Sequence, residues 1–216
     1  MLSDRLKSAL SLVPSGSTCI DVGADHGYLS LALESQGNIC YAVENKKGPY
    51  KSLLNHLKSY PELKVVPLLQ DGISYLPKNV DSIIILGMGG ITIRNILSAN
   101  KSFPKQIKYL IVEPQSDFKE TISYLLNLGY ENDNGLFVFE KRYYPLLRFV
   151  KSSNKTLEEY TPAQLNFGPY PLKSQDTKLK EYLLTELGRL TNLNIEGQEH
   201  HQKEINFINQ TLKDYF

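Results

Sequence analysis

The sequence predicts an α/β domain built on a seven-stranded, mostly parallel sheet, followed by a C-terminal α-helical hairpin or coiled coil. Short apolar runs alternate five times with segments of helical spacing, and a closing pair of strands follows them. This alternation predicts the sheet. From Ser174 to Phe216, leucines and isoleucines recur at helical spacing, and this second pattern predicts the helical hairpin.

Apolar periodicity places the individual elements along the chain. The helix over residues 3–13 has Ser3 or Asp4 as its N-cap and ends at Pro14-Ser15-Gly16. The strand over residues 82–86 carries a continuous apolar run, as expected of a central parallel strand. The same reasoning predicts helices at 28–33, 50–57, 91–97 and 118–126, and strands at 19–22, 38–44, 65–69, 109–112, 136–141 and 146–151.

The composition changes after residue 152, so we expect two domains, residues 1–155 and 156–216. The segment 160–172 is rich in proline, glycine and aromatic residues and is predicted to be a connector. Glycines and asparagines between Gly188 and Gly197 predict a break between two helices. We expect these helices to lean on the first domain without carrying chemistry.

The overall composition excludes several classes of protein. The 216 residues are enough for a full core, and the hydrophobic content of 41% with 22% charged residues is ordinary for a globular protein. A net charge of +1 gives no global field that would attract a polyanion, so any nucleic-acid binding must come from local patches. Cys19 and Cys40 both fall in predicted core strands, where we expect reduced packing residues rather than a disulfide or a metal site.

The segment 19–29 carries the strongest candidate for a ligand site. An apolar strand leads into a tight turn with Gly23, Asp25 and Gly27, and a helix follows. The turn's backbone N–H groups and the helix N-terminus face a ligand at the carboxyl end of the strand. Asp25 stands where a dinucleotide fingerprint has its middle glycine, and its carboxylate would repel a pyrophosphate. A nicotinamide dinucleotide is therefore disfavoured, and a glycine turn without any cofactor is the alternative.

Acidic residues end the next two predicted strands. Glu44 lies 23 positions after Asp21, close to the spacing of a carboxylate that binds a ribose diol with two charge-assisted hydrogen bonds. The strand that ends at Leu69 is followed by Gln70-Asp71-Gly72. These positions extend the predicted ligand site.

Several motifs together resemble a known enzyme family. The pattern D-x-G-x-x-x-G at residues 21–27 is similar to the first motif of class I S-adenosylmethionine-dependent methyltransferases. Further motifs, in chain order, are Leu2-Ser3-Asp4-Arg5-Leu6 before the turn, and Glu44-Asn45, Gly48-Pro49-Tyr50, Asp71-Gly72, Gly87-Met88-Gly89-Gly90 and Asn166-Phe167-Gly168-Pro169 after it. The set resembles the bacterial tRNA (adenine-N1)-methyltransferases that modify position 22, the TrmK family, over nearly the whole chain. One departure is Glu113-Pro114-Gln115, where we expect Gln-Pro-Asn.

The resemblance implies a Rossmann-like methyltransferase fold, S-adenosyl-L-methionine as cofactor, and methylation at N1 of an adenine in the tRNA D-arm. The implied cofactor-binding residues are Asp21, Gly23, Ala24, Asp25, His26, Gly27, Glu44, Asn45, Asp71, Gly72, Gly87, Met88 and Gly89. Asp25 is our candidate for a catalytic carboxylate that accepts the N6 proton after methyl transfer. Its alternative role is to bind the turn backbone or the amino group of the cofactor's methionine part.

A second set of residues is expected to meet the RNA. N1 lies on the Watson–Crick edge, so the target base must be unpaired or flipped, with Tyr28 or Tyr50 as a stacking partner. Between Lys141 and Lys155 lie five basic residues and no acidic one, a pattern typical of a phosphate-tracking edge or, alternatively, of a solvated outward face. The candidate substrate residues are Arg5, Tyr28, Tyr50, Gly90, Gln115, Arg142 and Arg148.

We therefore expect a cytoplasmic tRNA-modifying enzyme that acts as a monomer, without a metal and without a membrane segment. The alternatives are a methyltransferase of the same fold that acts on another RNA site or on a small molecule, and a non-catalytic tRNA-binding module. Fold alone does not distinguish these functions.

Overall fold

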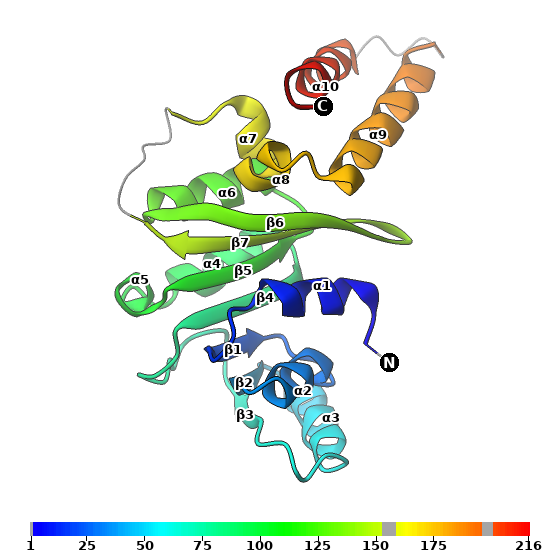
Figure 1. Ribbon diagram of the computed structural model, residues 1–216. Helices are drawn as coiled ribbons and strands as arrows, with labels where there is room; N and C mark the ends of the chain where they lie inside the picture. The colour runs from blue at the N-terminus through cyan, green and yellow to red at the C-terminus, as the bar shows by residue number, and fades with distance from the viewer. Residues whose placement is uncertain (1, 153–158, 196–200) are drawn as a thin grey trace.

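The computed structural model describes residues 2–152, 159–195 and 201–216. Its centre is a seven-stranded sheet in the order β3-β2-β1-β4-β5-β7-β6 (Figure 1). Strands β1 to β5 are parallel, and β7 runs antiparallel to both of its neighbours, which confirms the predicted sheet. The strands are β1 (Thr18–Val22), β2 (Ile39–Glu44), β3 (Val66–Leu69), β4 (Ser82–Met88), β5 (Tyr109–Pro114), β6 (Tyr130–Glu140) and β7 (Arg142–Lys151).

Helices cover both faces of this sheet, giving three layers. Helices α1 (Asp4–Leu12) and α2 (Tyr28–Ser35) pack on one face through Ala9, Leu12 and Leu33. Helices α4 (Gly90–Ser98), α5 (Phe103–Gln106) and α6 (Phe118–Asn127) pack on the other face through a larger cluster. Helix α3 (Lys47–Leu57) contacts β2 and β3. The carboxyl ends of β1, β2, β4 and β5 therefore meet at one edge of the sheet, where open α/β sheets bind their ligands.

Both cysteines are buried in this core with free thiols. Cys19 on β1 and Cys40 on β2 lie opposite each other in the parallel register. Burial raises the pKa of the Cys19 thiol to about 12 and also raises that of Cys40, because an ionised thiolate is poorly solvated there. Both side chains thus act as small apolar core residues.

The last two strands are longer than their apolar runs suggest. β6 begins at Tyr130, six residues before the predicted start, and its first half is polar. The register of β6 against β7 shifts between Asn132 and Asn134, which marks a bulge. The Asn132 side chain is buried there and donates to the backbone oxygens of Asn134 and Arg148, both at 2.8 Å. Side-chain hydrogen bonds thus allow a polar segment to lie in the sheet.

The C-terminal part is helical over most of its described length, which confirms the predicted C-terminal helices, and two details differ from the prediction. The expected connector at 160–172 contains α7 (Pro162–Phe167) and α8 (Pro169–Lys173), each with proline in its first turn. The expected break from Gly188 is absent as far as residue 195, because α9 (Thr177–Ile195) continues through Gly188. Helix α10 (Gln202–Tyr215) follows. The predicted domain boundary at 155/156 falls in 153–158 and the end of the predicted break in 196–200, both outside the described residues.

The C-terminal helices share a third apolar cluster with the sheet edge. Leu172, Leu179 and Leu183 pack in it with Ile205 and Ile208. Phe137 of β6 belongs to the same cluster, and Tyr143 of β7 packs against it. These helices therefore lie against the β6–β7 hairpin, on the side of the sheet away from β3 (Figure 1).

Candidate active site at the carboxyl ends of the strands

The glycine turn after β1 is shaped by left-handed backbone angles. Gly23 and Gly27 have φ values of 76° and 73°, and Asp25 between them has a φ of 52°. The positive φ of Gly27 favours glycine, and a Cβ there would also stand 2.7 Å from the Leu53 Cδ1. The N–H groups of Gly23 and Ala24 donate to the Val43 carbonyl oxygen at 2.9 and 3.1 Å. The turn is thus fixed to the end of β2.

Glu44 ends β2 directly beside this turn. Its side chain is only 8% exposed, and the Asp25 N–H donates to its Oε1 at 2.6 Å. Within the described part of the chain, this is the one hydrogen bond to the Glu44 carboxylate. A buried carboxylate has room for several donors, so the second oxygen is available to a ligand. The arrangement fits a vicinal diol, such as that of a ribose.

Asp21 lies beneath the turn rather than at its mouth. The side chain is buried in β1, and Ser30 Oγ of α2 donates to its Oδ2 at 2.7 Å. Burial raises the pKa of this carboxyl group to about 6, while the Ser30 hydrogen bond opposes the shift. Asp21 therefore supports the junction of β1 and α2, and through it the turn.

An ion pair with a buried carboxylate lies at the carboxyl end of β5, between Glu113 and Arg5 of α1. Glu113 is fully buried, and Arg5 Nη1 from α1 donates to its Oε1 and Oε2 at 3.0 and 3.2 Å. Burial raises the pKa of the Glu113 carboxyl group, and the Arg5 guanidinium partly opposes this. Arg5 lies in the first turn of α1, which Ser3 caps by accepting a hydrogen bond from the Leu6 N–H.

The β6–β7 turn adds further groups around Arg5. The Arg5 guanidinium lies 5.1 Å from the centre of the Tyr144 ring, and the Arg142 guanidinium lies 4.8 Å from the same ring. Arg5 Nε also lies 3.9 Å from Glu140 Oε2. Two cations and an aromatic ring thus border the buried Glu113.

The glycine motif of residues 87–90, which spans the end of β4 and the start of α4, differs from the prediction at one residue. Gly87 is exposed with a φ of 72°, at a register shift between β4 and β5. Gly90, predicted to contact the RNA, is instead buried between α4 and α6, and its N–H donates to the Ser116 carbonyl oxygen at 3.1 Å. A Cβ on Gly90 would stand 2.6 Å from that oxygen. Close packing therefore requires this glycine, and its N–H is not free for a base.

The remaining predicted residues surround the same strand ends. Asp25, His26, Asn45 and Asp71 are exposed, while Ala24, Met88 and Gly89 are half-buried and Gly72 is buried. Gln115 is exposed, and its N–H donates to the Met88 carbonyl oxygen at 2.9 Å. Its Nε2 lies 3.6 Å from the position that a Cβ on Gly87 would take. β4 and β5 thus bring Gln115 to the exposed Gly87.

The two tyrosines predicted to stack on a base lie on helices α2 and α3. Tyr28 is 50% exposed and its ring centre lies 4.6 Å from that of His56. His26 completes this group, 5.9 Å from Tyr28. Tyr50 is half-buried on α3.

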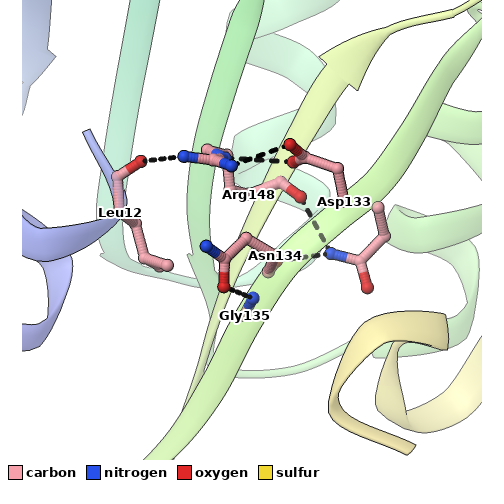
Figure 2. A network of polar contacts seen from close by, with 6 residues as sticks. Leu12, Asp133, Asn134, Gly135 and Arg148 are labelled. Atoms are coloured by element: carbon pink, nitrogen blue, oxygen red, sulfur yellow. Dashed lines mark hydrogen bonds and ion pairs between the residues drawn. The ribbon is translucent and has the colours of Figure 1, made fainter. Parts of the chain in front are cut away.

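Arg148, predicted to contact RNA, is used inside the fold (Figure 2). Its Nε and Nη2 donate to the two carboxylate oxygens of Asp133 at 3.0 and 2.8 Å. Its Nη1 donates to the Leu12 carbonyl oxygen at 3.1 Å. All three nitrogens of the guanidinium group are engaged, so Arg148 ties β7 to β6 and to the end of α1. Of the other predicted basic residues, Lys141 and Arg142 are exposed at the hairpin turn, and Lys155 lies outside the described residues.

Glu113 and Glu140 are the site residues that sequence reasoning missed. Glu113 was noted only as a departure from an expected motif. The signal that could have found it was a glutamate at the end of an apolar strand, as at Glu44. Among the described residues, no three His, Cys, Asp or Glu side chains are grouped so as to hold a metal ion, and no described helix has the length and apolar character needed to cross a membrane.

A family model described as a methyltransferase domain matches residues 2–147. The chain belongs to this methyltransferase family. The match covers strands β1 to β6 and the first half of β7, and so includes every strand end that forms the site.

Relatives of this methyltransferase agree with the predicted resemblance. The tRNA (adenine(22)-N(1))-methyltransferase of Bacillus subtilis (strain 168) is 32% identical over 126 residues, which are 52% of this chain. The aligned segment spans only about half of that relative, 49% of its length.

Solved structures match over the full chain. Streptococcus pneumoniae Sp1610 in complex with S-adenosyl-L-methionine superposes with a TM-score of 0.87 at 25% identity, covering 98% of this chain and 100% of that one. The B. subtilis m1A22 tRNA methyltransferase TrmK superposes with a TM-score of 0.74 at 22% identity, covering 100% and 94%. At that identity the second likeness shows the fold alone. Both matches include the C-terminal helices.

Proposed function

We propose that this methyltransferase transfers a methyl group from S-adenosyl-L-methionine to N1 of adenine 22 in the D-arm of tRNA. The observation that carries the proposal is the buried Glu44 carboxylate, held by the Asp25 N–H beside the glycine turn, with one oxygen open to a ligand. The B. subtilis relative supports the identity of the substrate, and the Sp1610 complex supports that of the cofactor.

The residues at the carboxyl ends of β1 and β2 fit the proposed cofactor. Glu44 would accept hydrogen bonds from its ribose hydroxyl groups, and the exposed turn residues Gly23 and Asp25 lie next to Glu44. Asp71 at the end of β3 would meet the adenine ring. S-adenosyl-L-methionine supplies an electrophilic methyl group on a sulfonium centre. A carboxylate such as Asp25 is compatible with this cation, whereas it would repel a pyrophosphate.

The residues at the ends of β4 and β5 fit an acceptor base. N1 of adenine is a neutral nucleophile, so the chain mainly has to hold the base in line with the methyl group. The exposed Gly87 lets a base approach the backbone closely, and the Gln115 amide beside it can donate to or accept from the base edge. After transfer the N6 proton becomes acidic, and Asp25 is our candidate to accept it.

The RNA side of the proposal rests on the hairpin turn. Lys141 and Arg142 are exposed there, next to Tyr143 and Tyr144, and cations interleaved with aromatic rings suit a strand of RNA. A monomeric state, a cytoplasmic location and a domain boundary at 155/156 stay predictions.

The test is methyl transfer from labelled S-adenosyl-L-methionine to unmodified tRNA transcripts that carry either adenine or guanine at position 22. The product is mapped as a stop in reverse transcription, because a methyl group on N1 blocks the Watson–Crick edge. We expect a stop at adenine 22 and none on the guanine transcript. Cofactor binding without any tRNA product would contradict the proposal and favour another substrate or a non-catalytic binding module.

A further inference from the structure

A cavity of about 220 Å³ lies beside the proposed acceptor site. It is bordered by the end of β5, the start of α6, the β6–β7 hairpin and helices α7 and α9. Six aromatic side chains line it, namely Phe118, Phe137, Tyr143, Tyr144, Phe167 and Tyr182. The methyltransferase sheet and the C-terminal helices both contribute to its wall, so the cavity exists only where the two parts meet.

The rings hold one another in place around Tyr182 of α9. The Tyr182 ring centre lies 5.8 Å from that of Phe137, nearly parallel to it, and 5.5 Å from that of Tyr143. Phe167 of α7 packs edge-on at 6.4 Å. Flat apolar walls of this kind bind planar ring systems by stacking.

Polar groups are few in the lining. Gln115 and Asn166 supply amides, and Arg142 supplies a guanidinium that also lies over the Tyr144 ring. The Asn166 Nδ2 donates to the Pro162 carbonyl oxygen at 2.7 Å, which leaves its Oδ1 as an acceptor. The Gln115 amide can donate to or accept from a base edge, and an exposed guanidinium can bind a phosphate. This combination of rings, amides and one cation is the chemistry that recognises a nucleotide.

We propose that this cavity binds the unpaired base of a nucleotide directly next to the target adenine. The proposal rests on the proposed function, since it requires an RNA substrate. The cavity begins at Gln115, and its lining residues include neither the glycine turn of residues 23–27 nor Gly87–Gly90. It therefore lies to one side of the place where methyl transfer must occur, and the two share Gln115 at their border.

The size of the cavity agrees with one base. Sites for drug-sized ligands usually enclose about 300–1,000 Å³, so a volume of about 220 Å³ holds a single planar ring system rather than a whole nucleotide. The ribose and phosphate would stay outside, next to Arg142. A second flipped base would give the residues of α7 and α9 in the cavity lining a role in RNA binding.

The first arm of the test measures binding without turnover. The fluorescent base 2-aminopurine is placed in the tRNA transcript at the target, or directly 5′ or 3′ of it, and each RNA is titrated with the full-length protein and S-adenosylhomocysteine. We expect the emission of one neighbouring probe to change when it stacks in the cavity. Phe118→Ala and Tyr182→Ala should abolish this change. Leu184→Ala, which removes an exposed side chain from α9, should leave it intact.

The second arm measures methylation of transcripts with an abasic site at the same neighbouring position. Stacking of one base on aromatic side chains corresponds to a roughly 5- to 150-fold effect. We expect kcat/KM of the wild-type protein to fall by such a factor and that of Phe118→Ala to be equally low with either RNA. Cofactor affinity should be unchanged in every variant, which separates loss of the cavity from loss of the fold.

Each outcome decides one point. Full methylation of the abasic transcript, or a probe response only at the target position, would overturn the neighbour assignment. Absence of methylation on the intact tRNA would overturn the proposed function alone, because the fluorescence arm still tests the cavity by binding.

Discussion

Replacing Arg5 with methionine should leave a buried carboxylate without its main cation. Glu113 is fully buried, and Arg5 Nη1 lies within hydrogen-bond distance of both of its carboxylate oxygens. Methionine keeps most of the apolar stem of arginine and removes the charge, so the change isolates the ion pair.

The expected loss follows from burial. Removing one partner of a buried pair costs about 3–5 kcal/mol. Because the Arg5 side chain is 26% exposed, solvent screens part of the interaction, and we expect about 2–3 kcal/mol at pH 8. For a chain of this size such a loss lowers Tm by roughly 5–10 °C.

The loss should depend on pH in a defined direction. The pKa of Glu113 is already raised from 4.5 in the folded protein, and removal of Arg5 raises it further. The folded state then binds the proton more tightly than the unfolded state does. Stability therefore falls as pH rises from about 4.5 through the folded pKa, and the destabilisation by Arg5→Met should be much smaller at pH 5 than at pH 8.

The assay is thermal unfolding of the wild type and the variant at pH 5 and pH 8. Lys7→Met on the same helix is the matched control, because Lys7 forms only an exposed pair with Asp4 at 2.8 Å. The control should change stability by less than about 1 kcal/mol. Adding Glu113→Gln to Arg5→Met should recover most of the loss at pH 8. Equal losses at both pH values, or no recovery, would refute the reasoning.

Three further predictions concern the turn. Asp25→Ala should keep measurable cofactor binding and lose most of the turnover; loss of binding by calorimetry would place Asp25 in the cofactor site instead. Glu44→Gln should weaken cofactor binding about 10- to 100-fold, because it removes a charge-assisted hydrogen bond, and an unchanged Kd would contradict the ribose assignment. Asp21→Asn should raise the free energy of unfolding by up to about 3 kcal/mol at pH 7 and by little at pH 4, because the pKa of Asp21 is about 6 in the folded protein and 3.8 in the unfolded chain. Denaturant unfolding at the two pH values measures this difference.

The sequence predicted best what local patterns determine. The number and direction of the strands followed from apolar runs, and the turn at Gly23 beside Glu44 followed from residue types at strand ends. The family resemblance agrees with the methyltransferase match and with the relatives found. Tertiary packing decided the rest. The prolines and glycine of segment 160–172 predict a connector. In the structure α7 forms there, because the Thr161–Gln164 capping box satisfies the first backbone N–H groups of this short helix.

Contacts between distant segments were beyond the sequence patterns. Arg5 and Glu113 are separated by 108 positions, and only the docking of α1 across the sheet brings them together. Gly90 was assigned to the substrate because glycine allows close approach of a ligand. In the structure the close neighbour is the Ser116 backbone. A glycine at position 90 is equally compatible with close approach of a ligand and with close approach of another backbone segment.

The Arg148 network has a consequence for how the protein is made. It joins the Leu12 carbonyl oxygen to a side chain 136 positions later in the chain (Figure 2). During translation this contact cannot form until β7 has left the ribosome. The helix that carries Arg5 is the first to be synthesised, but its C-terminal end gains this bond only after β7 has been made. A chain truncated before Arg148 would lack the link that joins α1, β6 and β7.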